Sequence, residues 1–207
     1  MDTLQTYDEL PYDSLPLPET QPDVLAAIAR LHGFAAPDPG QARVLELGCA
    51  AGGNLISLAY QHPDANFIGI ELSRRQAQAG ADFIAALGLN NVQIRHGDLA
   101  ALPEELGAFD YIIAHGVYSW VPAAVQQALL AVCRKHLTPH GLAYISFNVT
   151  AGWQKLLPLR QALLEGTDKL LSAPERVQQA YAVLTQLESD CIDPFLLQEI
   201  RYLKTAA

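Results

Sequence analysis

VLELGCAAGG, residues 44–53, connects an apolar strand pattern to a helical pattern through a turn of small residues. The strand pattern carries a carboxylate, Glu46, near its end, and the helical pattern NLISLA, residues 54–59, follows directly. Small residues allow a ligand to lie against bare backbone, and the N–H groups at a helix N-terminus face negative groups. This stretch therefore predicts a site for a nucleotide-like cofactor.

From residue 42 onward, strand and helix patterns alternate. Helical spacing covers residues 54–61, 73–87 and 122–137, with a weak turn around 103–106. The strand patterns between them are mostly apolar and partly β-branched; they are Arg43–Leu47, Asn66–Ile70, Val92–His96, Tyr111–Ala114 and Leu142–Phe147. Such alternation is typical of a parallel sheet covered on both faces, so we expect an α/β fold, a Rossmann-like doubly wound sheet. Ligands of these sheets lie beyond the carboxyl ends of the strands.

The segments that flank this core have different patterns. Prolines in the first 22 residues predict an extended arm, and Asp23 is expected to cap a helix that ends at Gly33. After Trp153 the patterns are helical only, over residues 156–165, 174–188 and 194–204. We therefore expect three parts: an N-terminal arm and helix (1–41), the cofactor-binding core (42–153) and a helical segment (154–207).

Composition limits the classes of partner. The chain has 207 residues, of which 50% are hydrophobic and 17% charged, as in a folded globular protein. With 13 basic and 22 acidic residues its formal net charge is −9, which argues against a nucleic-acid partner and suits a basic peptide or a small molecule. Three separate cysteines indicate reduced thiols and no zinc site. Without a signal peptide or an apolar run of membrane-spanning length, a cytoplasmic protein without a membrane partner is expected.

The glycine pattern of the first loop does not by itself identify the cofactor. Gly48-x-Ala50-x-x-Gly53 fits the dinucleotide fingerprint loosely, with Ala in place of the second Gly. Glu46-x-Gly48-x-Ala50-x-Gly52 fits the first motif of the S-adenosylmethionine fold equally well, again with one Ala for Gly. Plain packing of a helix on a strand is the third interpretation of these small residues.

The second loop adds a carboxylate at the end of the next strand. Glu71 follows the apolar run Ile68-Gly69-Ile70 and can accept hydrogen bonds from both hydroxyls of a ribose. The adjacent Ser73 is explained by helix capping alone. Nicotinamide and S-adenosylmethionine proteins share such a carboxylate, so Glu71 does not separate them.

The third loop favours S-adenosylmethionine. His96-Gly97-Asp98-Leu99 ends a strand with an acidic residue followed by an apolar one. In a methyltransferase the Asp98 carboxylate would accept from the adenine amine and the Leu99 N–H would donate to the ring, although a turn or capping role explains Asp98 as well. Carboxylates at three successive strand ends suit a positively charged sulfonium better than a pyrophosphate.

The fourth loop, AHGVYSWVP at residues 114–122, combines a glycine with aromatic residues. Gly116 allows close approach of the backbone, and Tyr118 and Trp120 can hold a cation or the alkyl stem of a lysine. Ordinary packing explains the two aromatic residues equally well. His115 is a candidate for proton transfer, with a structural hydrogen-bonded role as the alternative.

Together these loops resemble those of class I S-adenosylmethionine-dependent methyltransferases. More narrowly, the sequence is similar to bacterial methyltransferases that carry a methyltransferase regulatory domain, a group that includes protein-lysine methyltransferases acting on an outer-membrane protein. The segments that carry this resemblance are YDELPY (7–12), TQP (20–22), AHGVYSWVP (114–122) and ISFNVTAGW (145–153). The family's usual form of the last segment is closer to SYNTYPGW, so Phe147 and Ala151 depart from it.

The resemblance implies methyl transfer from S-adenosylmethionine, with a protein lysine nitrogen as the favoured acceptor and without a metal. The cofactor would be held at the methionine moiety, the ribose and the adenine by Glu46, Gly48, Ala50, Gly52, Asn54, Glu71, Leu72, Asp98, Leu99, His115 and Gly116. The acceptor side and catalysis would involve Tyr118, Trp120, Asn148 and His115.

The same resemblance implies a truncated sheet, because the family continues to further strands beyond a regulatory domain that would begin in residues 154–207. An open sheet edge favours a homodimer. The alternatives are a cofactor-binding regulatory or assembly protein without transfer activity, a small-molecule methyltransferase and, with least support, a nicotinamide oxidoreductase.

Overall fold

The computed structural model describes residues 14–168 and 170–205, which form two compact units. The first unit extends to Phe147 and the second begins at Asn148, and each is described by itself. The YDELPY segment at residues 7–12 lies outside the described residues.

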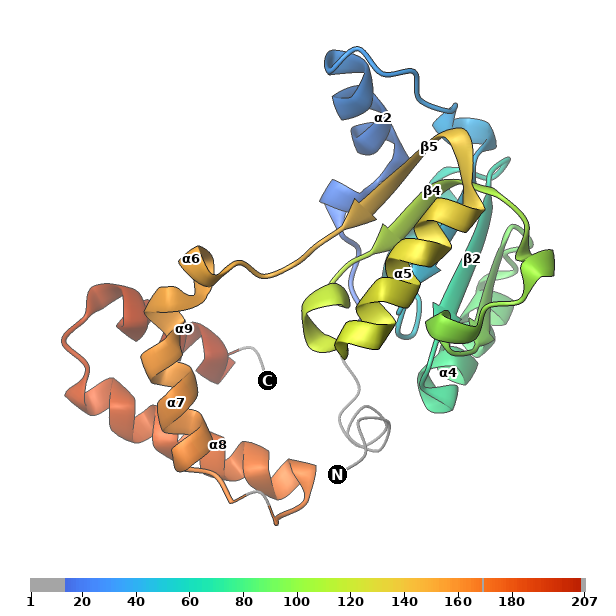
Figure 1. The fold of residues 1–207 in the computed structure, drawn as a ribbon. Helices are drawn as coiled ribbons and strands as arrows, with labels where there is room; N and C mark the ends of the chain where they lie inside the picture. Colours follow the sequence, from blue (N-terminus) through green and yellow to red (C-terminus); the bar gives the residue numbers. More distant parts are fainter. Residues whose placement is uncertain (1–13, 169, 206–207) are drawn as a thin grey trace. The chain divides into compact units, whose positions relative to one another are not determined.

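The first unit is built on five parallel strands (Figure 1). They are β1 (Arg43–Leu47), β2 (Asn66–Glu71), β3 (Val92–His96), β4 (Phe109–Ala114) and β5 (Leu137–Ile145). Their order is β3-β2-β1-β4-β5, and every neighbouring pair is parallel. The predicted Rossmann-like doubly wound sheet is therefore confirmed. Its strand order reverses between β1 and β4, which is where open α/β sheets bind ligands.

Helices connect the strands and cover both faces of the sheet. The first unit contains η1 (Pro18–Thr20), α2 (Pro22–Leu31), η2 (Pro39–Gln41), α3 (Gly53–Gln61), α4 (Arg74–Leu87), η3 (Leu99–Ala101), η4 (Glu104–Leu106), η5 (Tyr118–Trp120) and α5 (Ala123–His136). The connection between β3 and β4 has only the short turns η3 and η4, and α5 crosses in front of the strands in the view of Figure 1.

Alternate residues of the strands feed two separate cores. Val44 and Phe67 face a core that includes side chains of α2, α3 and α4. Their chain neighbours Leu45 and Ile68 face the opposite core, which includes side chains of α5. Burial of a large apolar side chain contributes about 1.5–3 kcal/mol, so the sheet is the most firmly held part of this unit. The strand ends that carry the loops are fixed by it.

The predicted cap of α2 and the predicted bounds of the fifth strand are wrong. Helix α2 begins at Pro22, so Asp23 lies in its first turn and pairs with His62 at 2.9 Å instead of capping. The fifth strand covers Leu137–Ile145 instead of residues 142–147. Its first part contains Pro139 and Gly141, which are typical of a turn, and its pairing with β4 is irregular between Phe109 and Tyr111.

The second unit contains helices and no strand in its described residues, so the predicted helical region is confirmed. It comprises α6 (Thr150–Trp153), η6 (Gln154–Leu156), α7 (Leu157–Glu165), α8 (Ala173–Asp190) and α9 (Pro194–Thr205). Leu159, Leu184 and Ile200, one from each long helix, form its small core. A capping box of Ser172 and Glu175 starts α8. Among the helices of the described residues, none has the length and apolarity that crossing a membrane needs.

Candidate functional site

The loops after β1, β2 and β3 are joined at the carboxyl edge of the sheet. The Gly48 N–H donates to the Ile70 carbonyl at 2.8 Å, and the Gly97 N–H donates to the Glu71 carbonyl at 2.9 Å. These bonds place the predicted residues of three separate loops along one edge. The parallel arrangement of the strands brings them together, because all carboxyl ends then point the same way.

The β1–α3 loop makes its turn through left-handed backbone at Gly48, Ala50 and Gly52, with φ of 70°, 51° and 78°. A Cβ on Gly52 would lie 2.2 Å from Cδ1 of Ile94, which would have to move, and the left-handed φ also favours glycine at this position. Ala50 is the only non-glycine residue with positive φ in the described part of the chain. Left-handed backbone costs an L-residue about 1–2 kcal/mol, so the alanine that departs from both glycine fingerprints is under strain.

Glu46 is a buried carboxylate whose hydrogen bonding is incomplete. Its side chain is on β1 and only 4% of the residue is exposed. Oε1 accepts from Nδ2 of Asn54 at 3.1 Å, whereas Oε2 is buried without a hydrogen-bond partner. Burial raises the pKa of Glu46 to about 7, against the opposing effect of the Asn54 hydrogen bond. A buried acceptor of this kind needs a donor, and a cationic donor would also favour its ionised form.

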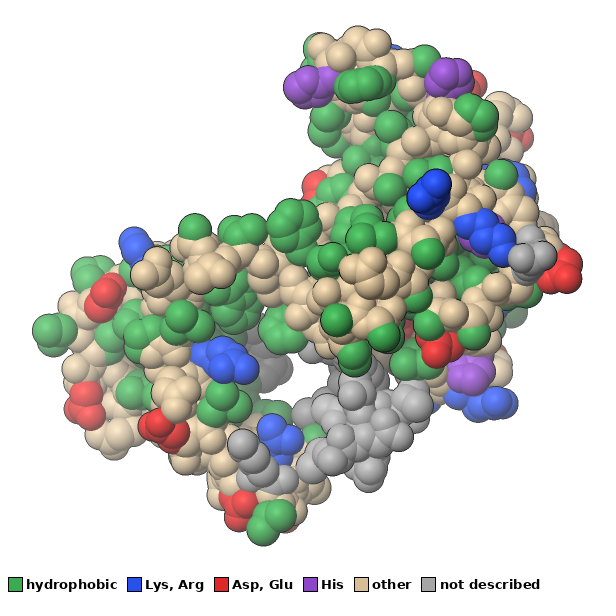
Figure 2. Space-filling view, viewed as in Figure 1, with side chains coloured by type: hydrophobic (Ala, Val, Ile, Leu, Met, Phe, Trp, Pro, Cys, Tyr) green, Lys and Arg blue, Asp and Glu red, His purple; other side chains and the backbone are tan. Residues whose placement is uncertain are grey.

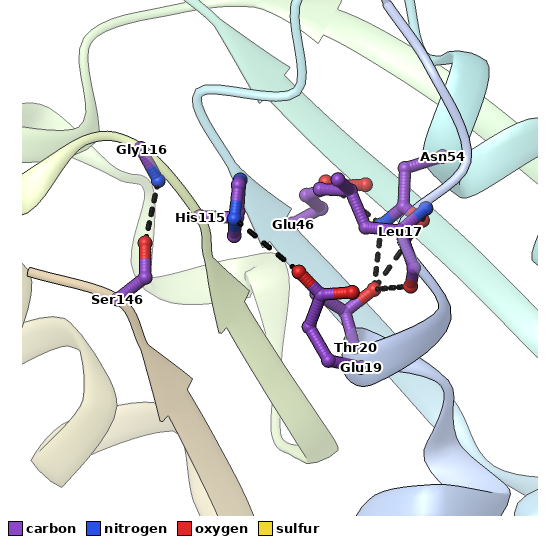
Figure 3. Close-up of polar contacts among 8 residues, drawn as sticks. All are labelled: Leu17, Glu19, Thr20, Glu46, Asn54, His115, Gly116 and Ser146. Carbon is purple, nitrogen blue, oxygen red and sulfur yellow. Dashed lines mark hydrogen bonds and ion pairs between the residues drawn. The ribbon is translucent and has the colours of Figure 1, made fainter. Parts of the chain in front are cut away.

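Asn54 connects Glu46 to the N-terminal segment (Figure 3). Its Oδ1 accepts from the Leu17 N–H at 2.9 Å, and its Nδ2 also donates to the Thr20 hydroxyl at 3.0 Å. Asn54 was expected at the cofactor, but Thr20 and Leu17 were not. The TQP segment at residues 20–22 indicated only a family resemblance, because a spacing of 34 residues between Thr20 and Asn54 carries no periodic signal.

Glu71 accepts hydrogen bonds from the neighbouring loop and from its own loop, and its carboxylate can still accept further ones. Its Oε2 accepts from the Ala50 N–H at 2.9 Å and its Oε1 from the Ser73 N–H at 2.8 Å. Each carboxylate oxygen has a second lone pair, so two hydroxyls of a ribose can still be bound. Leu72, next in the chain, is 38% exposed and offers an apolar surface beside this carboxylate. Ser73 caps α4 by accepting from the Gln76 N–H, as predicted.

Asp98 caps a short helical turn, the role that is the alternative to adenine binding. One of its carboxylate oxygens, Oδ1, accepts from the Ala100 N–H at 2.8 Å at the start of η3. Asp98 is exposed and Leu99 is half-buried against the core under α5. The cap leaves the other oxygen and the Leu99 backbone at the same edge as Glu71. Their part in adenine binding stays a prediction.

The backbone just after β4, at Gly116, has open space at the position of a Cβ. Gly116 has a φ of 68°, nothing lies within 4 Å of where its Cβ would be, and its N–H donates to Oγ of Ser146 at 2.8 Å. His115 stacks on Tyr144 with ring centroids 6.2 Å apart. Its Nε2 lies 3.7 Å from Oε1 of Glu19 on η1 (Figure 3). The structural alternative for His115 therefore has support, and its proton-transfer role stays a prediction.

Aromatic side chains follow Gly116. Tyr118 packs edge-to-face on Phe147, with ring centroids 6.3 Å apart. Phe147 is 62% exposed and Trp120 is 54% exposed, so apolar surface is available there. Asn148 belongs to the second unit, and its predicted place on the acceptor side stays a prediction.

The carboxyl ends of β1, β2 and β3 carry the acidic side chains Glu46, Glu71 and Asp98. Burial, Glu46 and Glu71 together raise the pKa of the Cys49 thiol well above its ordinary value, so Cys49 is neutral. On the face drawn in Figure 2, Lys and Arg side chains are scattered and not gathered into one patch. The described residues contain no cluster of three or more His, Cys, Asp or Glu side chains suited to a metal ion.

These residues fit S-adenosylmethionine. The unpartnered oxygen of Glu46 would suit its ammonium group, and the spare lone pairs of Glu71 would suit its ribose. The space around Gly116 is open. A dinucleotide pyrophosphate would instead be repelled by the carboxylates.

Comparisons with known proteins identify the family of the chain. Residues 44–141 match the family described as "Methyltransferase domain". An uncharacterized protein of Rickettsia prowazekii is 38% identical over 201 residues, which are 97% of this chain and 36% of that protein. A second uncharacterized protein of the same organism is 32% identical over 208 residues, covering 98% of this chain and 83% of that protein.

A solved structure extends the similarity to three dimensions. PKMT2 from Rickettsia typhi, in complex with AdoHcy, has a TM-score of 0.82 and 32% sequence identity. The match covers 94% of this chain and 38% of PKMT2. The chain thus spans about a third of the length of PKMT2 and of the first relative.

Proposed function

The chain belongs to the class I S-adenosylmethionine-dependent methyltransferases, with S-adenosylmethionine as cofactor, and we propose that it forms the cofactor-binding part of a protein-lysine methyltransferase. The proposal of a lysine acceptor is supported by the resemblance of the loops to those of a family that includes protein-lysine methyltransferases. It is also supported by the net charge of −9, which suits a basic peptide.

One observation carries the proposal for the site. The buried, half-partnered carboxylate of Glu46 lies on β1, at the point where the strand order reverses, and Glu71 lies on the adjacent β2. Two fixed carboxylates favour a ligand with a cationic group and a pair of hydroxyls. The open backbone at Gly116, on the other side of the reversal, provides room for the rest of that ligand.

The residues of this chain would act mainly by binding and alignment. S-adenosylmethionine, when bound, supplies a methyl group on a positively charged sulfur, which is an activated leaving group. Glu46 would hold the ammonium group and Glu71 the ribose. Hydrogen bonds fix both carboxylates, from Asn54 of α3 to Glu46 and from the Ala50 N–H of the neighbouring loop to Glu71. Fixed orientation of two reacting groups lowers the barrier because its entropic cost is met on binding.

The aromatic residues after β4 would receive the acceptor. Tyr118 and Phe147, which follows β5, pack against each other, and the exposed Trp120 lies in the same short turn as Tyr118. Such rings pack against the alkyl stem of a lysine. A poorly hydrated amine is neutral more often, and only the neutral amine is a nucleophile.

The test is a search for transfer and for its product. The protein, in its longest natural form, is incubated with S-adenosylmethionine carrying a labelled methyl group and with bacterial proteins, and peptides are analysed by mass spectrometry. We expect label on lysine nitrogens. Label on small molecules only would contradict the proposed lysine acceptor. Cofactor binding without any transfer of label would support the alternative of a regulatory protein without transfer activity.

A further inference from the structure

We propose that Thr20 is a positioning residue for Glu46 and acts through Asn54, so that the η1 segment belongs to the cofactor site. This inference rests on the proposed function, because it assigns Glu46 to the cofactor. The observation behind it is a chain of hydrogen bonds from Thr20 through Asn54 to Glu46 (Figure 3).

The orientation of the Asn54 amide is determined by a backbone donor. The Leu17 N–H can only donate, so the amide oxygen of Asn54 must face it, at 2.9 Å. The amide nitrogen then faces Oε1 of Glu46 at 3.1 Å. The Thr20 hydroxyl lies 3.0 Å from this nitrogen and 3.3 Å from the amide oxygen, so it contacts both ends of the amide. The N-terminal segment therefore decides that Glu46 meets a donor and not a second acceptor.

Thr20 locks this arrangement. Its side chain is fully buried, with 0% exposure, and its hydroxyl donates to the Leu17 carbonyl at 2.9 Å while accepting from Asn54. The hydroxyl thus uses a donor and an acceptor function at once, which a valine of nearly the same shape cannot do. Without it, one Nδ2 hydrogen of the buried Asn54 amide would lose its acceptor, whereas the Leu17 carbonyl would keep the bond from the Thr20 N–H at 3.0 Å.

The consequence at Glu46 is geometric. The bond from Asn54 holds one carboxylate oxygen, and this leaves the other, Oε2, as the buried acceptor without a partner. A carboxylate that rotates freely would present either oxygen, or neither, to a cationic donor. The hydrogen bonds from Thr20 through Asn54 therefore fix the orientation of the Glu46 carboxylate before the ligand binds.

A second contact shows that η1 reaches the other side of the site. Glu19, beside Thr20, has Oε1 3.7 Å from Nε2 of His115, which follows β4. Thr20 is linked to the β1 side and Glu19 to the β4 side, so η1 bridges the strands between which the order reverses. The segment is in the right place to act on the ligand site rather than on a remote part of the fold.

The test compares Thr20→Val with Thr20→Ser by calorimetric titration of S-adenosylhomocysteine between pH 6 and 8.5. We expect Thr20→Val to weaken binding about tenfold at pH 8, and Thr20→Ser, which keeps the hydroxyl, to restore most of the affinity. Wild-type affinity should fall as Glu46 gains a proton. In Thr20→Val that fall should begin at higher pH, because the Asn54 hydrogen bond opposes the rise of the Glu46 pKa and is loosened. The other titratable groups on the surrounding elements, Cys49, Glu71, Glu19 and His115, are the same in all variants.

Thr138→Val is the matched control. Thr138 donates to Oδ1 of Asp110 at 3.1 Å, at the amino end of β5. This variant should lose stability without any change in affinity or in its pH dependence. If Thr20→Val does not fold, Asn54→Ala removes the bond to Glu46 directly and should shift the pH dependence in the same direction.

The outcomes separate this inference from the proposed function. Absence of binding by the wild-type chain would contradict the proposed function itself. Binding by the wild type with an unchanged affinity and pH dependence in Thr20→Val would overturn only the role of Thr20. Equal losses in Thr20→Val and Thr20→Ser would also overturn it, because they would indicate packing and not the hydroxyl.

Discussion

Replacement of Glu46 by glutamine should stabilise the ligand-free protein at alkaline pH and weaken cofactor binding at the same time. Burial raises the pKa of Glu46 from an ordinary 4.5 to about 7. Between these values the folded state holds a proton that the unfolded state has released, so the free energy of unfolding falls as pH rises and levels off above about 7. Glutamine keeps the shape and has no charge to bury.

The size of the effect follows from the shift. A difference of 7 − 4.5, or 2.5 units, corresponds to about 3 kcal/mol at about 1.4 kcal/mol for each unit. The wild type should therefore lose about 3 kcal/mol of stability between pH 4.5 and 8 relative to Glu46→Gln. Any cost of the new amide inside the protein is the same at all pH values, so the difference between two pH values isolates the charge.

The assay is urea unfolding of both proteins at half-unit steps of pH, followed by circular dichroism. S-adenosylhomocysteine binding is measured in parallel, and Glu46→Gln should bind more weakly because the partner of the ammonium group is lost. Parallel stability profiles for the two proteins would refute the reasoning, since they would mean that Glu46 titrates normally and is not a strained buried acid.

Three further predictions concern the loops. Ala50→Gly should raise the free energy of unfolding in urea by up to about 1 kcal/mol, because Ala50 has a φ of 51°. Ala51→Gly is the control, since Ala51 has no positive φ, and it should lower the free energy of unfolding. A lower stability of Ala50→Gly than of Ala51→Gly would contradict the assigned strain. Gly116→Ala and Gly88→Ala should each cost about 1 kcal/mol, since both glycines have left-handed φ and open space around them, but only Gly116→Ala should reduce S-adenosylhomocysteine affinity in calorimetry. Equal affinities of these two variants would exclude Gly116 from the site. Trp120→Ala should raise the KM for a lysine peptide several-fold without changing cofactor affinity; loss of cofactor affinity instead would move Trp120 to the other side of the site.

The parts of the fold that follow from local pattern were predictable. Arg43–Leu47 and Val92–His96 have the predicted boundaries, because an apolar run and an apolar-polar alternation, each bounded by turn residues, are local signals. The start of β5 was missed because the turn-like residues Pro139 and Gly141 are accommodated in a strand that pairs irregularly with β4. Tertiary pairing overrides local preference in that segment.

The site was predictable to the extent that it lies at strand ends. Glu46 and Glu71 are placed by the parallel sheet alone, so their positions follow from the strand pattern. The link from Thr20 to Asn54 joins an irregular segment to a helix, and the sequence between them has no periodicity that would bring the two together. That link becomes visible only through the hydrogen bonds of the folded chain.

The most direct test of the cofactor site is calorimetric titration of S-adenosylhomocysteine into the wild type, Glu71→Ala and Ser73→Ala. The Ser73 variant loses the cap of α4, at a cost of about 1 kcal/mol, but keeps the carboxylate. We predict one-to-one binding to the wild type and to Ser73→Ala, and severe loss of affinity in Glu71→Ala. Unchanged affinity in a folded Glu71→Ala would contradict the assignment of this strand edge as the S-adenosylmethionine site.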